Sequence, residues 1–299
     1  MGLAYSALTS AFAGNDSSID NGNVTGTAPG DQEPYSPIVT SMIAAGLNPP
    51  LFSMALQRSS SNAYNTPGGT FLPFFIAPYL LGSLSSSCSF SSPLSPSTTN
   101  SNLPPTGYIA FGGLPPVSSD PSAFISTPIL IYQWLGYPPL LASQRSFYTI
   151  QPDGYVYPNA KGTIKHHHTT IPAILDSGTT LLYAPTPVYN DWLNAFAEGT
   201  VAMYEGSPYA PCDINPDCVP YFGVKIAGTT FNVSEADLVL PTGSGYTNKS
   251  SGVEYCLLGL ADGGAGAESF PILGDVFLKN VVAVFDMGAN VVQLAQHDY

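Results

Sequence analysis

Short stretches of strand-like alternation dominate the hydrophobic pattern of this chain. Residues 51–56 (LFSMAL) alternate in this way, and the same period returns at 107–112. By the same criterion, further strands are predicted at 127–132, 145–150, 154–157, 171–176, 221–226, 229–233, 237–240, 255–260, 281–286 and 290–295. Many short strands separated by turn residues predict a mainly β, largely antiparallel architecture.

Two segments have helical spacing instead. Residues 37–46 begin with a proline and end with a glycine, which are the usual start and stop signals of a helix. A helix is also predicted at 187–196, opened by prolines at positions 185 and 187 and closed near Gly199. Helices are therefore a minor part of the predicted fold.

Residues 59–106 differ in composition from the rest of the chain. The apolar run FLPFFIAPYLL and a Ser/Pro-rich run follow one another over 70–106, without any charge. Such sequence does not build a core of its own, so we expect a poorly ordered insertion or a retained intron. Pro73 and Pro78 interrupt the apolar run, which is too short for a membrane helix, and no membrane span is predicted.

Composition narrows the classes of partner. The 299 residues include 7 Lys plus Arg against 20 Asp plus Glu, which gives a net charge of -13. Nucleic acids and anionic membranes bind clustered basic residues, so neither is an expected partner. With 44% hydrophobic residues, most of the chain is able to form a core. The acidic, lysine-poor composition also suits a protein that works in acid.

Cysteines and glycosylation sequons favour a secreted or vacuolar protein. The four cysteines are even in number and lack the paired spacing of zinc sites, so disulfides are expected. Four sequons would be glycosylated in a secretory lumen, at Asn15, Asn23, Asn232 and Asn248. Residues 1–13 lack the basic start of a signal peptide.

The candidate chemistry lies in residues 171–184, IPAILDSGTTLLYA. Asp176 follows an apolar strand and enters a turn at Ser177 and Gly178, where glycine permits tight bending. Neighbouring hydroxyls such as that of Thr179 can hydrogen-bond the carboxylate. A carboxylate held in this way can act as a general base on water, especially when a second carboxylate shares a proton with it. Alone, Asp-Ser-Gly is a common turn sequence.

A second motif, FPILGDVFLKNVVAVFD at 270–286, makes the pattern specific. Together the two motifs resemble the C-terminal lobe of a pepsin-like aspartic endopeptidase of the fungal secreted type. The resemblance implies a bilobal fold in which Asp176 is catalytic, Ser177 braces the loop across the lobe interface and Thr179 contacts substrate. Gly178 would supply the turn, and Ile272, Leu273 and Gly274 would form the segment that crosses beside it.

The resemblance begins partway into the N-terminal lobe. Residues 1–8 and 37–56 resemble later parts of that lobe, but no other Asp-Ser/Thr-Gly occurs and no segment resembles the flap. We therefore expect an N-terminally truncated chain, with an incomplete N-terminal lobe at 1–120 and the C-terminal lobe at 121–299.

The family implies hydrolysis of polypeptides at acid pH by a water that an Asp dyad activates, without cofactor or metal and as a monomer when complete. Because this chain carries only one of the two aspartates, we expect it to be weakly active or inactive alone. Two alternatives stay open: a catalytically dead binding or inhibitory protein on the same fold, and a half-enzyme that requires dimerisation.

Other polar residues have a structural interpretation. Asp275 and Asp286 are predicted to be turn or hydrogen-bonding residues. The run His166–His168 is predicted to be a solvated loop, since adjacent residues of an extended chain do not all face one metal ion. By resemblance, Cys256 pairs with Cys212 or Cys218, and the remaining member pairs with Cys88 or stays free.

Overall fold

The computed structural model describes residues 5, 36–57, 107–117, 121–132, 145–240, 245–248, 252–266 and 269–297. Its elements form four small sheets, in agreement with the predicted mainly β fold. The predictions for the insertion at 59–106, for Cys88 within it and for the sequons at Asn15 and Asn23 concern residues outside the described part of the chain. Among the described residues, no helix is long and apolar enough to cross a membrane.

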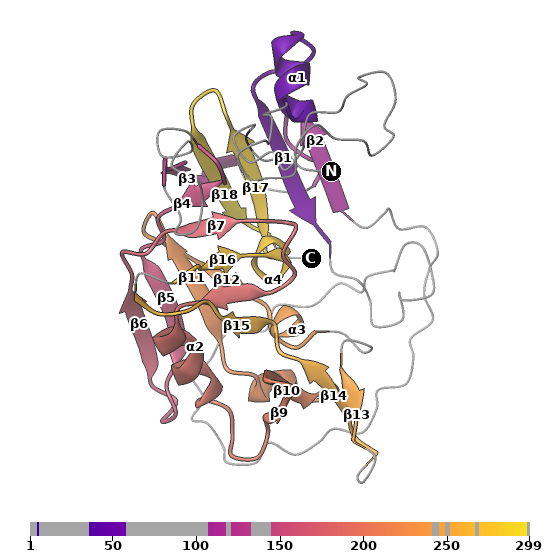
Figure 1. The fold of residues 1–299 in the computed structure, drawn as a ribbon, viewed down its shortest axis with the longest axis vertical. Helices are drawn as coiled ribbons and strands as arrows, with labels where there is room; N and C mark the ends of the chain where they lie inside the picture. Colours follow the sequence, from indigo (N-terminus) through magenta and orange to yellow (C-terminus); the bar gives the residue numbers. More distant parts are fainter. Residues whose placement is uncertain are drawn as a thin grey trace, which may run out of the picture.

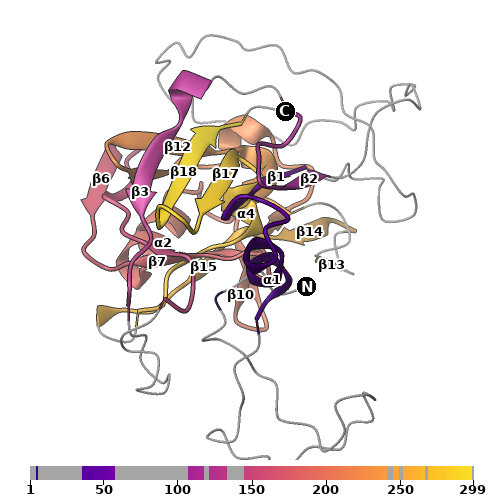
Figure 2. The ribbon, with the colours of Figure 1, turned by 90° about the horizontal axis from the view of Figure 1, so that it is seen from above.

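The first sheet joins residues from both ends of the chain, as Figures 1 and 2 show. Its strand order is β2-β1-β17-β18-β3, and all neighbours are antiparallel. The strands are β1 (Leu51–Leu56), β2 (Gly107–Phe111), β3 (Ile125–Pro128), β17 (Val281–Asp286) and β18 (Val291–Gln296). Helix α1 (Ile38–Ala44) precedes β1 and ends before Gly46, whose φ of 68° suits glycine.

Two further sheets form much of the remaining structure. One has the order β12-β11-β5-β6, and its strands are β5 (Gly154–Pro158), β6 (Ile164–His168), β11 (Phe222–Ile226) and β12 (Thr229–Val233). The other has the order β13-β14-β10-β9, and its strands are β9 (Ala202–Tyr204), β10 (Ser207–Pro211), β13 (Tyr246–Thr247) and β14 (Glu254–Leu257).

The fourth sheet has the order β15-β8-β16-β7-β4 and mixes parallel with antiparallel pairs. Its strands are β4 (Thr149–Ile150), β7 (Ala173–Leu175), β8 (Leu182–Ala184), β15 (Leu260–Asp262) and β16 (Ile272–Leu273). In the described part of the chain, the remaining helices are α2 (Thr186–Leu193), α3 (Glu235–Leu238), α4 (Asp275–Leu278) and two 3-10 turns at Pro121–Ala123 and Pro216–Cys218.

An aromatic cluster ties the first sheet to the segment that leads into β4. Phe52 of β1 stacks on Phe285 of β17 with ring centroids 4.7 Å apart, and Tyr148 lies 4.6 Å from Phe285. Tyr5 contacts Tyr148 at 5.1 Å. Residues on both sides of the predicted lobe boundary at 120 and 121 thus share one core, and the boundary itself stays a prediction.

Several sequence predictions of elements need correction. Residues 237–240 were predicted as a strand, but α3 occupies 235–238, because Ser234 caps it and its hydroxyl accepts the Ala236 N–H at 3.3 Å. The predicted loop at His166–His168 is part of β6, which pairs with β5. The strands predicted at 127–132 and 145–150 are shorter, at 125–128 and 149–150.

Candidate functional site

The site is a turn between β7 and β8 that holds Asp176. Strand β7 is fully buried and ends at Leu175, so the chain emerges from the core at Asp176, which is half-buried. The Gly178 N–H donates to Asp176 Oδ1 at 2.9 Å, and the Thr179 hydroxyl donates to Oδ2 at 2.7 Å. Both carboxylate oxygens therefore accept a hydrogen bond from within the turn, which fixes the orientation of the carboxylate.

Strand β16 runs directly beside this turn. Ile272 and Leu273 pair in parallel with the last two residues of β7, and the Asp176 N–H donates to the Leu273 carbonyl at 3.3 Å. A Cβ on Gly274 would lie 2.3 Å from the carbonyl oxygens of Thr179 and Leu181. The turn and the end of β16 thus approach so closely that only glycine fits at position 274.

Ser177 and Thr179 differ in their surroundings. Ser177 is exposed, and no hydrogen bond of its hydroxyl is present among the described residues. The hydroxyl that holds Asp176 within the turn belongs to Thr179. The roles that the resemblance assigned to these two residues, a brace across the lobes and a substrate contact, stay predictions.

Asp275 is a second carboxyl group beside the turn, at the start of α4. Its N–H donates to the Thr179 carbonyl at 2.8 Å. Burial raises the pKa of Asp275 to about 6; the charge of Lys279 lowers it and that of Asp176 raises it. Oδ1 of Asp275 is buried and has no hydrogen-bond partner among the described atoms. The sequence predicted a turn residue here, and nothing in the local sequence signals that one oxygen of its carboxyl group is buried.

The arrangement offers one oriented carboxylate at the surface of the described structure. Such a group can take a proton from a water molecule, or it can position that water molecule for attack on a substrate. No group of three or more metal-binding side chains is present in the described part of the chain. The orientation of Asp176 by its own turn suits carboxylate acid–base chemistry.

The other predicted site residues are spread over the fold. Cys212 and Cys256 form a disulfide that links the end of β10 to β14, one of the two pairings that the resemblance left open. Cys218 is also disulfide-bonded, so the alternative in which this remaining cysteine stays free is wrong. Asn232 is exposed on β12, and Asn248 is half-buried after β13. Asp286 closes the turn after β17, where its Oδ1 accepts the Ala289 N–H at 2.8 Å, as predicted for a turn residue.

Comparison with known proteins defines the class of this fold and site. The sequence profile described as eukaryotic aspartyl protease matches residues 100–297, which include Asp176 and the whole of β16. The chain therefore belongs to the eukaryotic aspartyl protease family, and the resemblance to pepsin-like proteins is confirmed.

Individual relatives in the comparison are also aspartic or acid proteases by name. The chain is 33% identical over 303 residues to a "Probable aspartic-type endopeptidase" of Aspergillus fumigatus, a match that covers 99% of this chain and 52% of the relative. It is 31% identical to an "Acid extracellular protease" of Yarrowia lipolytica, over 41% of this chain and 30% of the relative. It is 37% identical to human "Napsin-A", over 39% of this chain and 26% of the relative. The chain thus spans about half, or less, of the length of these relatives.

Proposed function

We propose that this chain is the part of an aspartic endopeptidase that contributes one catalytic carboxylate, Asp176. The observation that carries the proposal is the orientation of that carboxylate by the Gly178 N–H and the Thr179 hydroxyl, at 2.9 and 2.7 Å, beside β16. Membership of the eukaryotic aspartyl protease family supports it. The substrate would be a polypeptide bound in an extended conformation.

In this reaction a water molecule loses a proton to a carboxylate and attacks the peptide carbonyl carbon. A second acid protonates the carbonyl oxygen, and no covalent enzyme intermediate forms. Two carboxyl groups that share one proton perform both roles, so the reaction requires acid pH. Asp176 is the single aspartate of the chain that lies in an Asp-Ser/Thr-Gly sequence. We therefore infer that the 299-residue chain alone has weak or no activity.

The test compares two proteins. One is the 299-residue chain, and the other adds in-frame genomic sequence upstream of Met1 where this encodes another Asp-Ser/Thr-Gly. Cleavage of a denatured protein is measured between pH 3 and 6, with and without pepstatin. We expect pepstatin-sensitive cleavage by the longer protein, reduced about 100-fold or more by Asp176→Asn. Asp286→Asn makes the same chemical change in a turn of another sheet, after β17, and serves as the matched control.

Each outcome separates the alternatives. Activity that persists in Asp176→Asn rules out the role of Asp176. A folded longer protein that binds polypeptides without cleaving them supports the binding protein. Cleavage by the 299-residue chain that rises with the square of its concentration supports a half-enzyme in which two copies each donate Asp176.

We also propose a secreted or vacuolar location. The disulfide between Cys212 and Cys256 supports this location, because disulfides persist in oxidising compartments. The four sequons support it as well, because they would be glycosylated in a secretory lumen. Treatment of the protein from its natural host with an N-glycosidase should lower its apparent mass. Recovery from the cytosol at an unchanged mass would contradict the proposal.

A further inference from the structure

The few basic groups of this acidic protein gather on one sheet. The chain has 7 Lys plus Arg and 4 His in all. Three of these lysines and three of these histidines lie on or next to β5, β6 and β11: Lys161, Lys165, Lys225, His166, His167 and His168. This concentration of basic groups contrasts with the net charge of -13 for the whole chain, in which histidines are counted as neutral.

Strand pairing separates the three histidines into two faces. His168 lies opposite Gly154 of β5, which in turn lies opposite Lys225 of β11, so these three residues form one row across the sheet. His166 pairs with Val156 and lies on the same face, because side chains two apart in a strand point the same way. His167 pairs with Tyr155, whose side chain is buried in the core on the other face.

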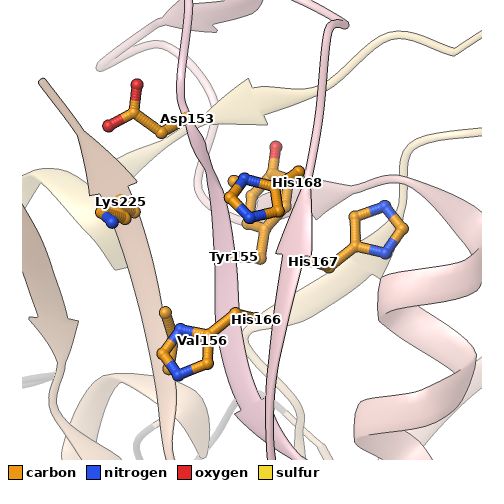
Figure 3. A pocket seen from close by; sticks show the side chains of 8 residues that line it. Asp153, Tyr155, Val156, His166, His167, His168 and Lys225 are labelled. Carbon is orange, nitrogen blue, oxygen red and sulfur yellow. The ribbon is translucent and has the colours of Figure 1, made fainter. Parts of the chain in front are cut away.

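The row across the sheet contains a hollow. Gly154 carries no side chain, so the space between Lys225 and His168 is open over the middle strand. A Cβ on Gly154 would lie 2.0 Å from the His167 carbonyl oxygen, which excludes larger residues from the floor. The hollow measures about 100 Å³. Figure 3 shows the rings of His166 and His168 on the side of β6 toward β5 and Lys225, and the ring of His167 turned away.

Two carboxylates near the hollow accept hydrogen bonds from other parts of the protein. Oδ2 of Asp153, at the rim, accepts the Gly228 N–H at 2.7 Å. Asp191 of α2 pairs with Lys165 at 2.7 Å and accepts the Tyr157 hydroxyl at 3.4 Å. By contrast, no hydrogen bond or ion pair of the Lys225 ammonium, or of either hollow-side imidazole, is present among the described residues. Two imidazoles and one ammonium group thus line one small space, with the carboxylate of Asp153 at its rim.

We propose that this hollow binds an oxyanion, a carboxylate or a sulfate-type group, and does so when His166 and His168 are protonated. A protonated imidazole has two N–H donors and no acceptor, so each protonated ring adds a positive charge and donors beside Lys225. Charge-assisted hydrogen bonds from three cationic donors then match the oxygens of one anion. The site lies on a different sheet from Asp176 and does not depend on the proposed proteolytic activity.

The test uses the complete 299-residue chain with sulfate, whose charge is constant over this pH range. Sulfate replaces chloride at constant ionic strength, and binding is followed by calorimetry and by the histidine ring signals in NMR at pH 5.5 and 7.5. We expect saturable binding at pH 5.5 that is about tenfold weaker at pH 7.5, since each charge at contact contributes a modest Coulomb energy in water. Acetyl-triglutamate is titrated in parallel to distinguish polypeptide carboxylates from free inorganic anions as the source of the oxyanion.

Matched variants distinguish anion binding in the hollow from general electrostatic attraction of anions to the protein. The double variant His166→Gln and His168→Gln should lose most binding at pH 5.5 and most of the pH dependence. Lys225→Gln should weaken binding at both pH values. His167→Gln, on the same strand but the opposite face, should bind like the parent, and thermal unfolding checks that all variants are folded. No saturable binding of either probe at pH 5.5, or an equal loss in His167→Gln, would overturn the proposal.

Discussion

Asp176 and Asp275 show how position alone gives two aspartates different behaviour. Both oxygens of Asp176 accept hydrogen bonds from its own turn. Asp275 lies immediately after Gly274, and one of its oxygens is buried without a partner among the described atoms. The same residue type therefore forms an oriented, half-buried carboxylate at one position and a carboxyl group that resists ionisation at the other.

The raised pKa of Asp275 predicts a dependence of stability on pH. Its pKa in the folded state is about 6, against 3.8 without the fold, so between these values the folded protein binds the proton more tightly. This contribution to the free energy of unfolding is present below pH 3.8 and is lost as pH rises toward 6. Because the side chain is only partly buried, we expect a loss on the order of 1 kcal/mol.

Urea unfolding at pH 3.5 to 7 measures this effect. Asp275→Asn should remove this part of the decline in stability between pH 4 and 6.5, whereas Glu254→Gln, which removes an exposed carboxylate on β14, should keep it. Parallel stability curves for the parent and Asp275→Asn would contradict the prediction.

At the scale of elements, the two-residue strand β16 joins the strands on either side of the Asp176 turn. It pairs with β7 on one side and β8 on the other, so it brings together the two ends of the turn that contains Asp176. The resemblance to pepsin-like proteases implied that Ile272–Gly274, with its apolar-apolar-Gly pattern, crosses beside the Asp176 turn. Periodicity did not find β16, since two residues are too few for any hydrophobic period.

The close contact at the end of β16 gives a prediction for Gly274→Ala. The added Cβ would meet two backbone carbonyl oxygens at 2.3 Å, and backbone does not move aside as easily as a side chain. We expect a loss of about 1–3 kcal/mol in the free energy of unfolding. Gly113→Ala is the matched control, because a Cβ there meets nothing within 4 Å. Equal unfolding midpoints in urea for the two variants would show that the turn can move apart from β16.

At the scale of the molecule, the first sheet contains strands from both predicted lobes. Strand β1 covers one edge of β17 from Leu51 to Ala55, and β17 would be an edge strand without it. β17 is buried from Val281 to Phe285. An exposed, apolar strand edge promotes association between chains.

A fragment of residues 121–299 should therefore be less soluble than a fragment of residues 36–299. The shorter fragment lacks β1 and β2 and exposes both the edge of β17 and the ring of Phe285. We expect it to form oligomers or aggregates at micromolar concentration in size-exclusion chromatography, while the longer fragment elutes at a smaller size. A monomeric fragment 121–299 with the melting temperature of the longer one would show that the C-terminal part folds independently.

The sequence by itself determined the class of fold and the residues of the Asp176 turn. Strands such as 51–56, 229–233 and 281–286 were predicted with their observed bounds, because each carries its own alternation or apolar run. Only the tertiary structure decided features that depend on residues far apart in the chain. The burial of Asp275, the pairing of β1 with β17 and the hollow between Lys225 and His168 all arise from neighbours that no local pattern encodes.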